Sequence, residues 1–341
     1  MTKGQDFKSD GQKNILLIRL KSIGDVILTL PAVHAMRENF PYAKITFLTS
    51  EENAALMGGF REVNQVITLD RAVLRSGNPM KMAGEFFKLL RRLRAGKFSL
   101  VVDLQGYGET AWLTRLTGAS QRWASTNRSG RAWAYTRSIK PIPMVHPAEA
   151  HLELLRKCGL KVGDTRNKFV LPEAAVSDAQ AWLTENRLNT AKPIIYIQPF
   201  TSGAHKNWPL ENYLAVARYW YSRNVQIIFG GGPSDRAALE LARQKGFTVS
   251  AGVPLLVTGG LMQLSTLVLG GDTGALHLAV AQGKRVLMLL HQDTPGSPVP
   301  FQHPEWVVVA PTPLAIAKIP VADVLAATER AFTESAGNVS C

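Results

Sequence analysis

The chain has 341 residues, 46% of them hydrophobic, which is enough for two packed domains of ordinary size. Its first residues are polar and no apolar run approaches the roughly 18 residues of a membrane-spanning helix, so we expect a cytoplasmic protein without a signal peptide. Two cysteines, Cys158 and Cys341, are too few for a disulfide framework or a cysteine-based metal site.

The net charge of +13 is confined to the first half of the chain. Residues 1–170 contain 27 Lys and Arg against 14 Asp and Glu, whereas residues 171–341 contain 12 of each kind. This asymmetry predicts an anionic partner for the first half, with nucleic acid, an acidic membrane surface and a phosphorylated substrate as the candidates. A basic surface that serves only solubility is the alternative.

Strand-like and helix-like segments alternate through the first half. In chain order we expect a strand at 15–18, a helix over 24–39, strands at 44–49 and 65–68, an amphipathic helix over 80–95 and a strand at 98–103. The stretch 121–138, rich in Arg, Ser, Thr and Trp, is expected to be a mobile loop. Such alternation predicts parallel strands joined by crossover helices.

The turn after the first strand, Leu20-Lys-Ser-Ile-Gly-Asp25, opens a helix. It places Asp25 at the carboxyl end of a strand, where ligands bind in open α/β sheets. An Asp in the first turn of a helix also stabilises that helix as a cap, so a catalytic and a capping interpretation of Asp25 both remain open.

The basic excess is steepest over residues 71–140, and from charge alone we expect its arginines to bind an anionic acceptor. The arginines in question are Arg115, Arg122, Arg128, Arg131 and Arg137. Three tryptophans lie among them, namely Trp112, Trp123 and Trp133. Tryptophans at such spacing more often belong partly to a core or anchor a loop than bind a ligand.

The second half repeats the alternation. We expect strands at 194–197, 225–229 and 285–290, with helices near 210–223 and 234–245. A helix that stops at Gly159, followed by Leu171-Pro172, predicts a domain boundary. The expected domains are therefore residues 1–170 and 171–320, followed by a helix within 321–341 that could pack back on the first domain.

Two loops of the second half follow strands. The loop at 198–209 combines Thr201 and Ser202 with Gly203 and Lys206, groups that together can hold phosphate oxygens. The turn at 229–235 resembles the opening of a dinucleotide fingerprint, but Asp235 stands where the third glycine belongs. A classical NAD enzyme is therefore not expected.

The segment Gly271-Asp-Thr-Gly-Ala-Leu-His-Leu-Ala279 stands where a strand leads into a helix. Backbone N–H groups at a helix start lack intrahelical acceptors and carry the positive end of the helix dipole, so this glycine-rich turn is suited to phosphate. Singly, Asp272 could be an N-cap and His277 an ordinary helix histidine. Together with Thr273 and Gly274 they predict an anion site.

Four motifs, in this order, resemble glycosyltransferase family nine, the heptosyltransferases of lipopolysaccharide core synthesis. They are Ile15-Leu-Leu-Ile-Arg-Leu-Lys-Ser-Ile-Gly-Asp-Val-Ile-Leu-Thr-Leu-Pro31, Val101-Val-Asp-Leu-Gln-Gly106, Lys206-Asn-Trp-Pro209 and the segment at 271–279. The resemblance covers most of the chain. It implies an α/β protein of GT-B type, with two Rossmann-like, doubly wound domains facing across a cleft.

The resemblance also implies an inverting transfer of heptose from ADP-heptose, bound by the second half, to a lipopolysaccharide inner-core acceptor, bound by the first. Asp25 would be the general base, more effective if partial burial raises its pKa. Lys206 would neutralise the leaving ADP, and Asp272 would position the turn or a sugar hydroxyl. The rest of the diphosphate cradle would be Thr201, Ser202, Thr273, Gly274 and His277. Asp235 stands near the place of an acid that often holds the ribose in this family.

Fixed dipoles and one ammonium group would meet the charge of the leaving group, so no metal or other cofactor is expected. The expected partners are the nucleotide-sugar donor, an anionic glycolipid acceptor and, peripherally, the acidic surface of the inner membrane. A GT-B enzyme using another nucleotide sugar, including an epimerase, is one alternative. A basic nucleic-acid-binding protein is another, although the chain shows no recognition element for nucleic acid.

Overall fold

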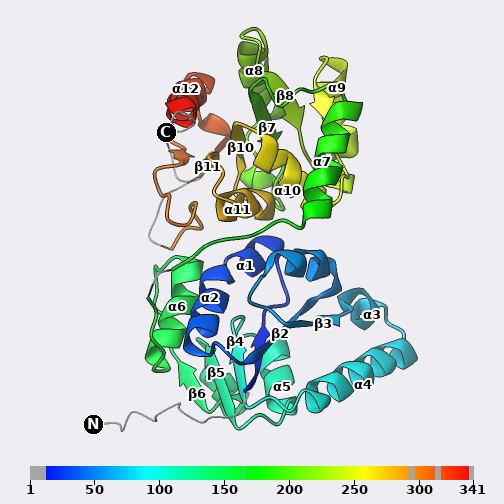
Figure 1. The fold of residues 1–341 in the computed structure, drawn as a ribbon, viewed down its shortest axis with the longest axis vertical. Helices are drawn as coiled ribbons and strands as arrows, with labels where there is room; N and C mark the ends of the chain where they lie inside the picture. The colour runs from blue at the N-terminus through cyan, green and yellow to red at the C-terminus, as the bar shows by residue number, and fades with distance from the viewer. Residues whose placement is uncertain (1–12, 164, 292–295, 312–315, 338–341) are drawn as a thin grey trace. The chain divides into compact units, whose positions relative to one another are not determined.

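The computed structural model describes residues 13–163, 165–291, 296–311 and 316–337. It divides into two compact units, one ending at Asn167 and the other beginning at Lys168 (Figure 1). The sequence placed this boundary after residue 170.

The first unit is built on a parallel sheet with strand order β3-β2-β1-β4-β5-β6. Its strands are β1 (Asn14–Ile18), β2 (Lys44–Ser50), β3 (Gln65–Leu69), β4 (Leu100–Asp103), β5 (Gln121–Ser125) and β6 (Arg137–Ile139). The four apolar residues of β1, Ile15 to Ile18, are fully buried. A central strand of a parallel sheet is covered on both faces, so it reads as a continuous apolar run.

Helices connect these strands. They are α1 (Ile23–Ile27), α2 (Leu30–Asn39), α3 (Arg71–Arg75), α4 (Pro79–Ala95), α5 (Gly108–Leu116) and α6 (Pro147–Lys157), with the 3₁₀ segments η1 (Glu51–Gly59) and η2 (Ser129–Ala134). The single helix expected over 24–39 is wrong, because α1 ends before α2 begins. Pro31 lies in the first turn of α2, where its missing N–H costs nothing; in a continuous helix its ring would clash with the carbonyl of Ile27.

The stretch 121–138 is not a loop. It contains β5, η2 and the start of β6, and β5 pairs with both β4 and β6. Trp123 is fully buried, whereas Trp112 and Trp133 are exposed and their rings meet edge to face at 4.6 Å. The expectation of a loop rested on polar composition, but the two apolar residues of β5, Trp123 and Ala124, lie in the core.

The second unit repeats this architecture with the order β12-β11-β10-β7-β8-β9. Its strands are β7 (Ile194–Gln198), β8 (Gln226–Phe229), β9 (Thr248–Val249), β10 (Leu267–Gly271), β11 (Val286–Leu290) and β12 (Val307–Val309). The winding direction reverses between β1 and β4 in the first sheet and between β7 and β10 in the second. Ligands of doubly wound sheets bind at such switch points, beyond the carboxyl ends of the strands.

The helices of the second unit are α7 (Glu173–Glu185), α8 (Leu210–Tyr221), α9 (Arg236–Gln244), α10 (Leu255–Leu264), α11 (Gly274–Ala281) and α12 (Val321–Gly337), with the 3₁₀ turns η3 (Ala204–Lys206), η4 (Pro233–Asp235) and η5 (Ile316–Lys318). The sequence left room for α12 to pack on the first domain. Within the second unit, α12 packs on α8: Trp220 Nε1 donates to Thr328 Oγ1 at 2.9 Å, and the Trp220 ring stacks on Phe332 at 4.6 Å. Packing of this helix on the first domain stays a prediction. Residues 338–341, including Cys341, lie outside the described part of the chain.

Two doubly wound α/β domains, as predicted, are confirmed by these sheets. None of the helices in the described ranges has the length and apolarity that crossing a bilayer requires.

Candidate active site

In the second unit, the loops after β7 and β10 meet at the switch point of the sheet. Lys206 Nζ lies 2.8 Å from Asp272 Oδ2, and His277 Nε2 lies 3.2 Å from Asp272 Oδ1. Burial alone would raise the pKa of Asp272, but the imidazole of His277 and the ammonium of Lys206 outweigh it and lower that pKa to about 2. The carboxylate is therefore ionised and holds both partners in place.

Two glycines allow these loops to meet. A Cβ on Gly270 would lie 2.4 Å from Gln198 O, and one on Gly271 would lie 2.7 Å from Thr201 Cγ2. Real Cβ atoms do not approach other atoms this closely, so only glycine lets the loop after β7 pack on the end of β10. This packing brings Lys206 to Asp272.

The start of α11 lies beside this ion pair. Thr273 is the N-cap, and its side chain accepts a hydrogen bond from Leu276 N at 3.3 Å. The first N–H groups of the helix, those of Gly274 and Ala275, have no acceptor within the helix. Lys206, Asp272, Thr273, Gly274 and His277 are thus brought together around a helix N-terminus, an arrangement suited to a diphosphate.

The remaining predicted donor residues are engaged locally. Thr201 Oγ1 lies 2.9 Å from both Gly203 O and Asn207 Oδ1, so Thr201 fixes the turn that carries Lys206. Ser202 is exposed on the same loop. Asp235 Oδ2 accepts from Gly232 N at 2.8 Å and closes its own turn before α9. Contact between Asp235 and a ribose stays a prediction.

In the first unit, Asp25 lies in α1 directly after β1. Arg19 Nη2 lies 2.9 Å from its Oδ1, and Ser22 N donates to its Oδ2 at 2.9 Å. Burial acts to raise the pKa of Asp25, but the Arg19 guanidinium and the hydrogen bonds from Ser22 together lower it. Partial burial therefore does not raise the pKa of Asp25, the condition under which it would be a more effective base, because Arg19 lies against this carboxylate.

Arg19 is itself held rigidly. Its Nη1 donates to Leu104 O at 2.8 Å and its Nε to Lys21 O at 3.0 Å. His151, on α6, interacts electrostatically with both Arg19 and Asp25. Burial and the Arg19 charge lower the His151 pKa to about 3, so its imidazole is neutral at physiological pH. Sequence reasoning missed both residues. Arg19 stands inside the motif quoted for Asp25, whereas no sequence signal marks His151.

Gln105 is another residue that sequence reasoning missed. Its Oε1 accepts from Leu20 N at 2.9 Å, which ties the end of β4 to the turn before Asp25. Its Nε2 is buried and has no hydrogen-bond partner among the described residues. Asp103 Oδ1 accepts from the N–H groups of Gln105 and Gly106, both at 2.9 Å, and so fixes this turn. Gln105 presents an unused donor, and buried unused donors are rare.

Gln105 lines a pocket of about 480 Å³ beyond the carboxyl ends of β4, β5 and β6. The other lining residues are Gly106, Tyr107, Ser125, Thr126, Asn127, Arg128, Arg131 and Pro141. Gly106 adopts a φ of +66°, and a Cβ there would lie 2.2 Å from Ser125 O, so only glycine fits between the two loops. The pocket therefore joins two cations, the side chain of Gln105 and the half-exposed ring of Tyr107.

The five predicted acceptor arginines do not gather in one place. Arg128 and Arg131 line the pocket, and Arg131 Nη1 donates to Gly106 O at 2.8 Å. Arg122 donates to the carbonyls of Ala119 and Ala134, and Arg137 donates to Cys158 O at 2.8 Å at the end of α6. Arg115 is exposed in the last turn of α5. Arg122 and Arg137 thus hold backbone segments together, which composition could not indicate.

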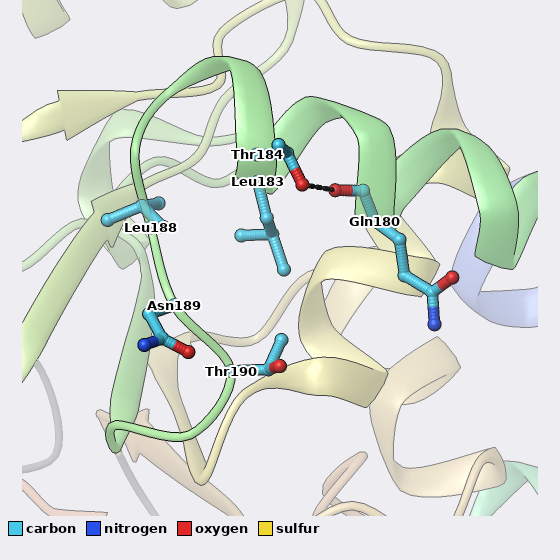
Figure 2. A pocket seen from close by; sticks show the side chains of 6 residues that line it. All are labelled: Gln180, Leu183, Thr184, Leu188, Asn189 and Thr190. Atoms are coloured by element: carbon cyan, nitrogen blue, oxygen red, sulfur yellow. Dashed lines mark hydrogen bonds between the residues drawn. The ribbon is translucent and has the colours of Figure 1, made fainter.

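A second pocket, of about 390 Å³, lies in the second unit where α7 ends and the chain turns toward β7 (Figure 2). It is lined by Gln180, Leu183, Thr184, Leu188, Asn189 and Thr190. These uncharged residues precede β7, at the edge of the sheet opposite the Lys206–Asp272 pair. Within the described residues, no group of three or more His, Cys, Asp or Glu side chains could hold a metal ion.

Comparison with known proteins gives a consistent result. The family model for glycosyltransferase family 9 (heptosyltransferase) matches residues 86–314. Lipopolysaccharide heptosyltransferase 3 of Escherichia coli is 24% identical over 277 residues, which are 78% of this chain and 80% of the relative.

Solved structures match over nearly the whole chain. A glycosyl transferase family 9 structure from Veillonella parvula DSM 2008 has a TM-score of 0.85 at 20% identity and covers 94% of this chain and 97% of its own. The E. coli heptosyltransferase WaaC with ADP-2-deoxy-2-fluoro heptose has a TM-score of 0.74 at 21% identity, with 93% and 99% covered. At 20% and 21% identity these structures show the fold alone, and they confirm the predicted GT-B type.

Proposed function

This chain belongs to glycosyltransferase family 9, and on that premise we propose that the enzyme transfers heptose from ADP-heptose to a lipopolysaccharide inner-core acceptor, with inversion at the anomeric carbon. The observation that carries the proposal is the meeting of Lys206, Asp272 and the start of α11 at the switch point of the second sheet. The relatives support the choice of sugar, since the E. coli relative is a lipopolysaccharide heptosyltransferase and WaaC has been solved with an ADP-heptose analogue.

The second unit would hold the donor. One Lys206 N–H is directed at Asp272, and the ammonium keeps two further donors for phosphate oxygens. The N–H groups of Gly274 and Ala275 would take other oxygens of the diphosphate. Charge that develops on the leaving ADP would then be met by groups already in place, so we expect turnover to persist in EDTA.

The first unit would activate the acceptor. The acceptor oxygen forms a bond to the anomeric carbon from the face opposite ADP. The bond from that carbon to the diphosphate oxygen breaks, and its electron pair leaves with ADP. The hydroxyl proton passes to Asp25, which is 39% exposed and ionised. A carboxylate of low pKa is a weak base, so it would take the proton late, when bond formation has made the hydroxyl acidic.

The pocket beside Gln105 would hold the acceptor. Arg128 and Arg131 suit a phosphate or carboxylate, and the half-exposed Tyr107 ring offers a face to a sugar. These are the features of an anionic saccharide site. Because such an acceptor is lipid-linked, we further propose a cytoplasmic enzyme in peripheral contact with the acidic inner-membrane surface, with no role for nucleic acid.

A nucleotide panel tests the donor assignment. Ligands that bind only the folded state raise the melting temperature, so we expect ADP and ADP-heptose to stabilise the protein more than UDP, GDP or their sugars do. The product formed from ADP-heptose and an inner-core acceptor should carry the inverted anomeric configuration by NMR. Preference for a UDP- or GDP-sugar would instead favour the other GT-B activities.

Paired arginine variants test the acceptor assignment. We expect Arg131→Ala to raise the acceptor KM roughly tenfold, the loss of one charge-assisted hydrogen bond, with donor affinity unchanged. Arg137→Ala is the matched control, because its guanidinium bonds Cys158 O; it should lower thermal stability and leave the KM of the folded enzyme unchanged. Equal KM effects from both variants would contradict the pocket as the acceptor site.

A further inference from the structure

The helix α4 presents apolar side chains on two opposite faces. Leu89 and Leu93 are buried against the first unit. Met80 and Phe87, two helical turns apart, point the other way and are 85% and 66% exposed. Figure 1 shows α4 as a long helix at the margin of the first unit, beside α3. Apolar side chains grouped on an outer face mark an interaction surface more often than isolated ones do.

Cations surround this apolar pair. The exposed basic residues of α4 are Lys81, Lys88, Arg91, Arg92 and Arg94. Glu85 is the acid of this helix; it lies 3.6 Å from Lys88 Nζ and also accepts from Asp70 N. Arg91 is four residues from Phe87 and therefore lies on the same face. The outer face thus combines two large apolar groups with several cations.

We propose that the outer face of α4, centred on Met80 and Phe87, docks the enzyme on an anionic lipid bilayer. Such a helix lies in the plane of the interface, with its apolar side chains between the lipids and its Lys and Arg side chains on the anionic headgroups. This inference rests on the proposed function, since it identifies the surface that would bring the enzyme to a lipid-linked acceptor.

Charge decides between possible occupants of this surface. A second copy of the chain would set cations against cations. Nucleic acid would satisfy the cations but leave Met80 and Phe87 without a partner. An anionic bilayer satisfies both. The position of α4 in the fold agrees with a bilayer partner. After β3 the chain forms α3 and then α4, so α4 begins at the carboxyl ends of the strands, the edge of the sheet at which the Gln105 pocket also lies.

Vesicle sedimentation tests the proposal without any substrate. The full-length enzyme should bind phosphatidylcholine vesicles that contain phosphatidylglycerol, and bind pure phosphatidylcholine weakly. The double variant Met80→Gln/Phe87→Gln, which keeps helix-forming residues, should lose at least tenfold in partitioning. Lys88→Gln/Arg91→Gln should lose about fivefold per charge, with the difference shrinking as salt rises.

Matched controls in the same unit distinguish binding through this surface from non-specific binding to vesicles. Tyr42→Gln removes an aromatic side chain that is 87% exposed, and Lys44→Gln/Arg61→Gln removes two exposed cations. Both controls should bind like wild type. Binding of the α4 variants at wild-type strength, or wild-type binding to nucleic acid but not to vesicles, would overturn the proposal. Turnover of a lipid-free acceptor reports on the proposed function separately and should be unchanged in the α4 variants.

Discussion

Asp25 in the first unit and Asp272 in the second lie beside the switch points of two sheets of the same winding, Asp25 after β1 and Asp272 after β10. Each follows the end of a strand beside a switch point, and each has a cation within 3 Å: Arg19 Nη2 at 2.9 Å and Lys206 Nζ at 2.8 Å. Their surroundings differ. Asp25 is 39% exposed, and its oxygens are held by one cation, Arg19, and by the N–H of Ser22. Asp272 is 16% exposed, and its oxygens are held by two side chains, Lys206 and His277.

The difference teaches how one fold gives a carboxylate two roles. Arg19 also donates to Leu104 O and Lys21 O, so its guanidinium is fixed by the backbone while it bonds Asp25. The Asp25 carboxylate stays 39% exposed. Lys206 comes from a separate loop and keeps donors free for a ligand. Under the proposed function, Asp25 would receive the proton of the acceptor and Asp272 would hold a cation for phosphate. The following predictions test that contrast, beginning with the largest effect.

Asp25→Asn should reduce kcat by about 10²–10⁴, the usual contribution of general-base assistance, and leave ADP affinity nearly unchanged. Asparagine can still accept from Ser22 N, so the turn should survive. Turnover at saturating acceptor and ADP calorimetry are the measurements. Wild-type turnover in this variant would reduce Asp25 to a helix cap.

Lys206→Ala should weaken ADP binding by about ten- to a hundredfold, because it removes a charged donor to phosphate. His277→Ala should weaken it less, since its imidazole acts through Asp272. Isothermal calorimetry with ADP measures both. Unchanged affinity in the two variants would remove the nucleotide site from the second unit.

Asp272→Asn should lower the free energy of unfolding at neutral pH by about 2 kcal/mol, the linkage value for a pKa of about 2 in the folded state against 3.8 unfolded. Since the folded pKa is depressed, this stability is present above about pH 4 and is lost as the pH falls toward 2. Urea unfolding measured across this pH range should therefore show a free energy of unfolding that depends less on pH in the variant than in the wild type. Asp25→Asn should have a smaller effect because solvent screens the more exposed pair; an equal effect would contradict the contrast.

Arg19→Gln should shift the acid limb of the kcat/KM profile to higher pH, because the charge that lowers the Asp25 pKa is gone. Arg19→Lys keeps the charge but not the fork that bonds Leu104 O and Lys21 O, so its shift should be smaller while kcat falls. An acid limb at the same pH in all three proteins would show that Asp25 does not control it.

Much of this organisation could be predicted from local pattern. The alternation of apolar, strand-like runs such as β1 and β7 with helix-like segments predicted two α/β domains with parallel strands, because burial on both faces of a parallel strand leaves a continuous apolar signature. The doubly wound GT-B type was implied by the resemblance to the family. The turns after β1 and β10 placed Asp25 and Asp272 at strand ends, and these positions predicted ligand sites there. These inferences need only residues that are neighbours in sequence.

Other features depend on contacts between residues far apart in the chain. The pKa direction of Asp25 is set by Arg19, whose guanidinium is anchored on Leu104, 85 residues away. Arg131 and Arg137 belong to one basic stretch and each donates to a backbone carbonyl, Gly106 O and Cys158 O respectively, but only Arg131 also lines the pocket. Composition therefore determined that the first half is cationic, but only the tertiary structure decided which cations line a pocket and which serve only to join backbone segments, because folding sets which carbonyls and which loops lie within reach of each guanidinium.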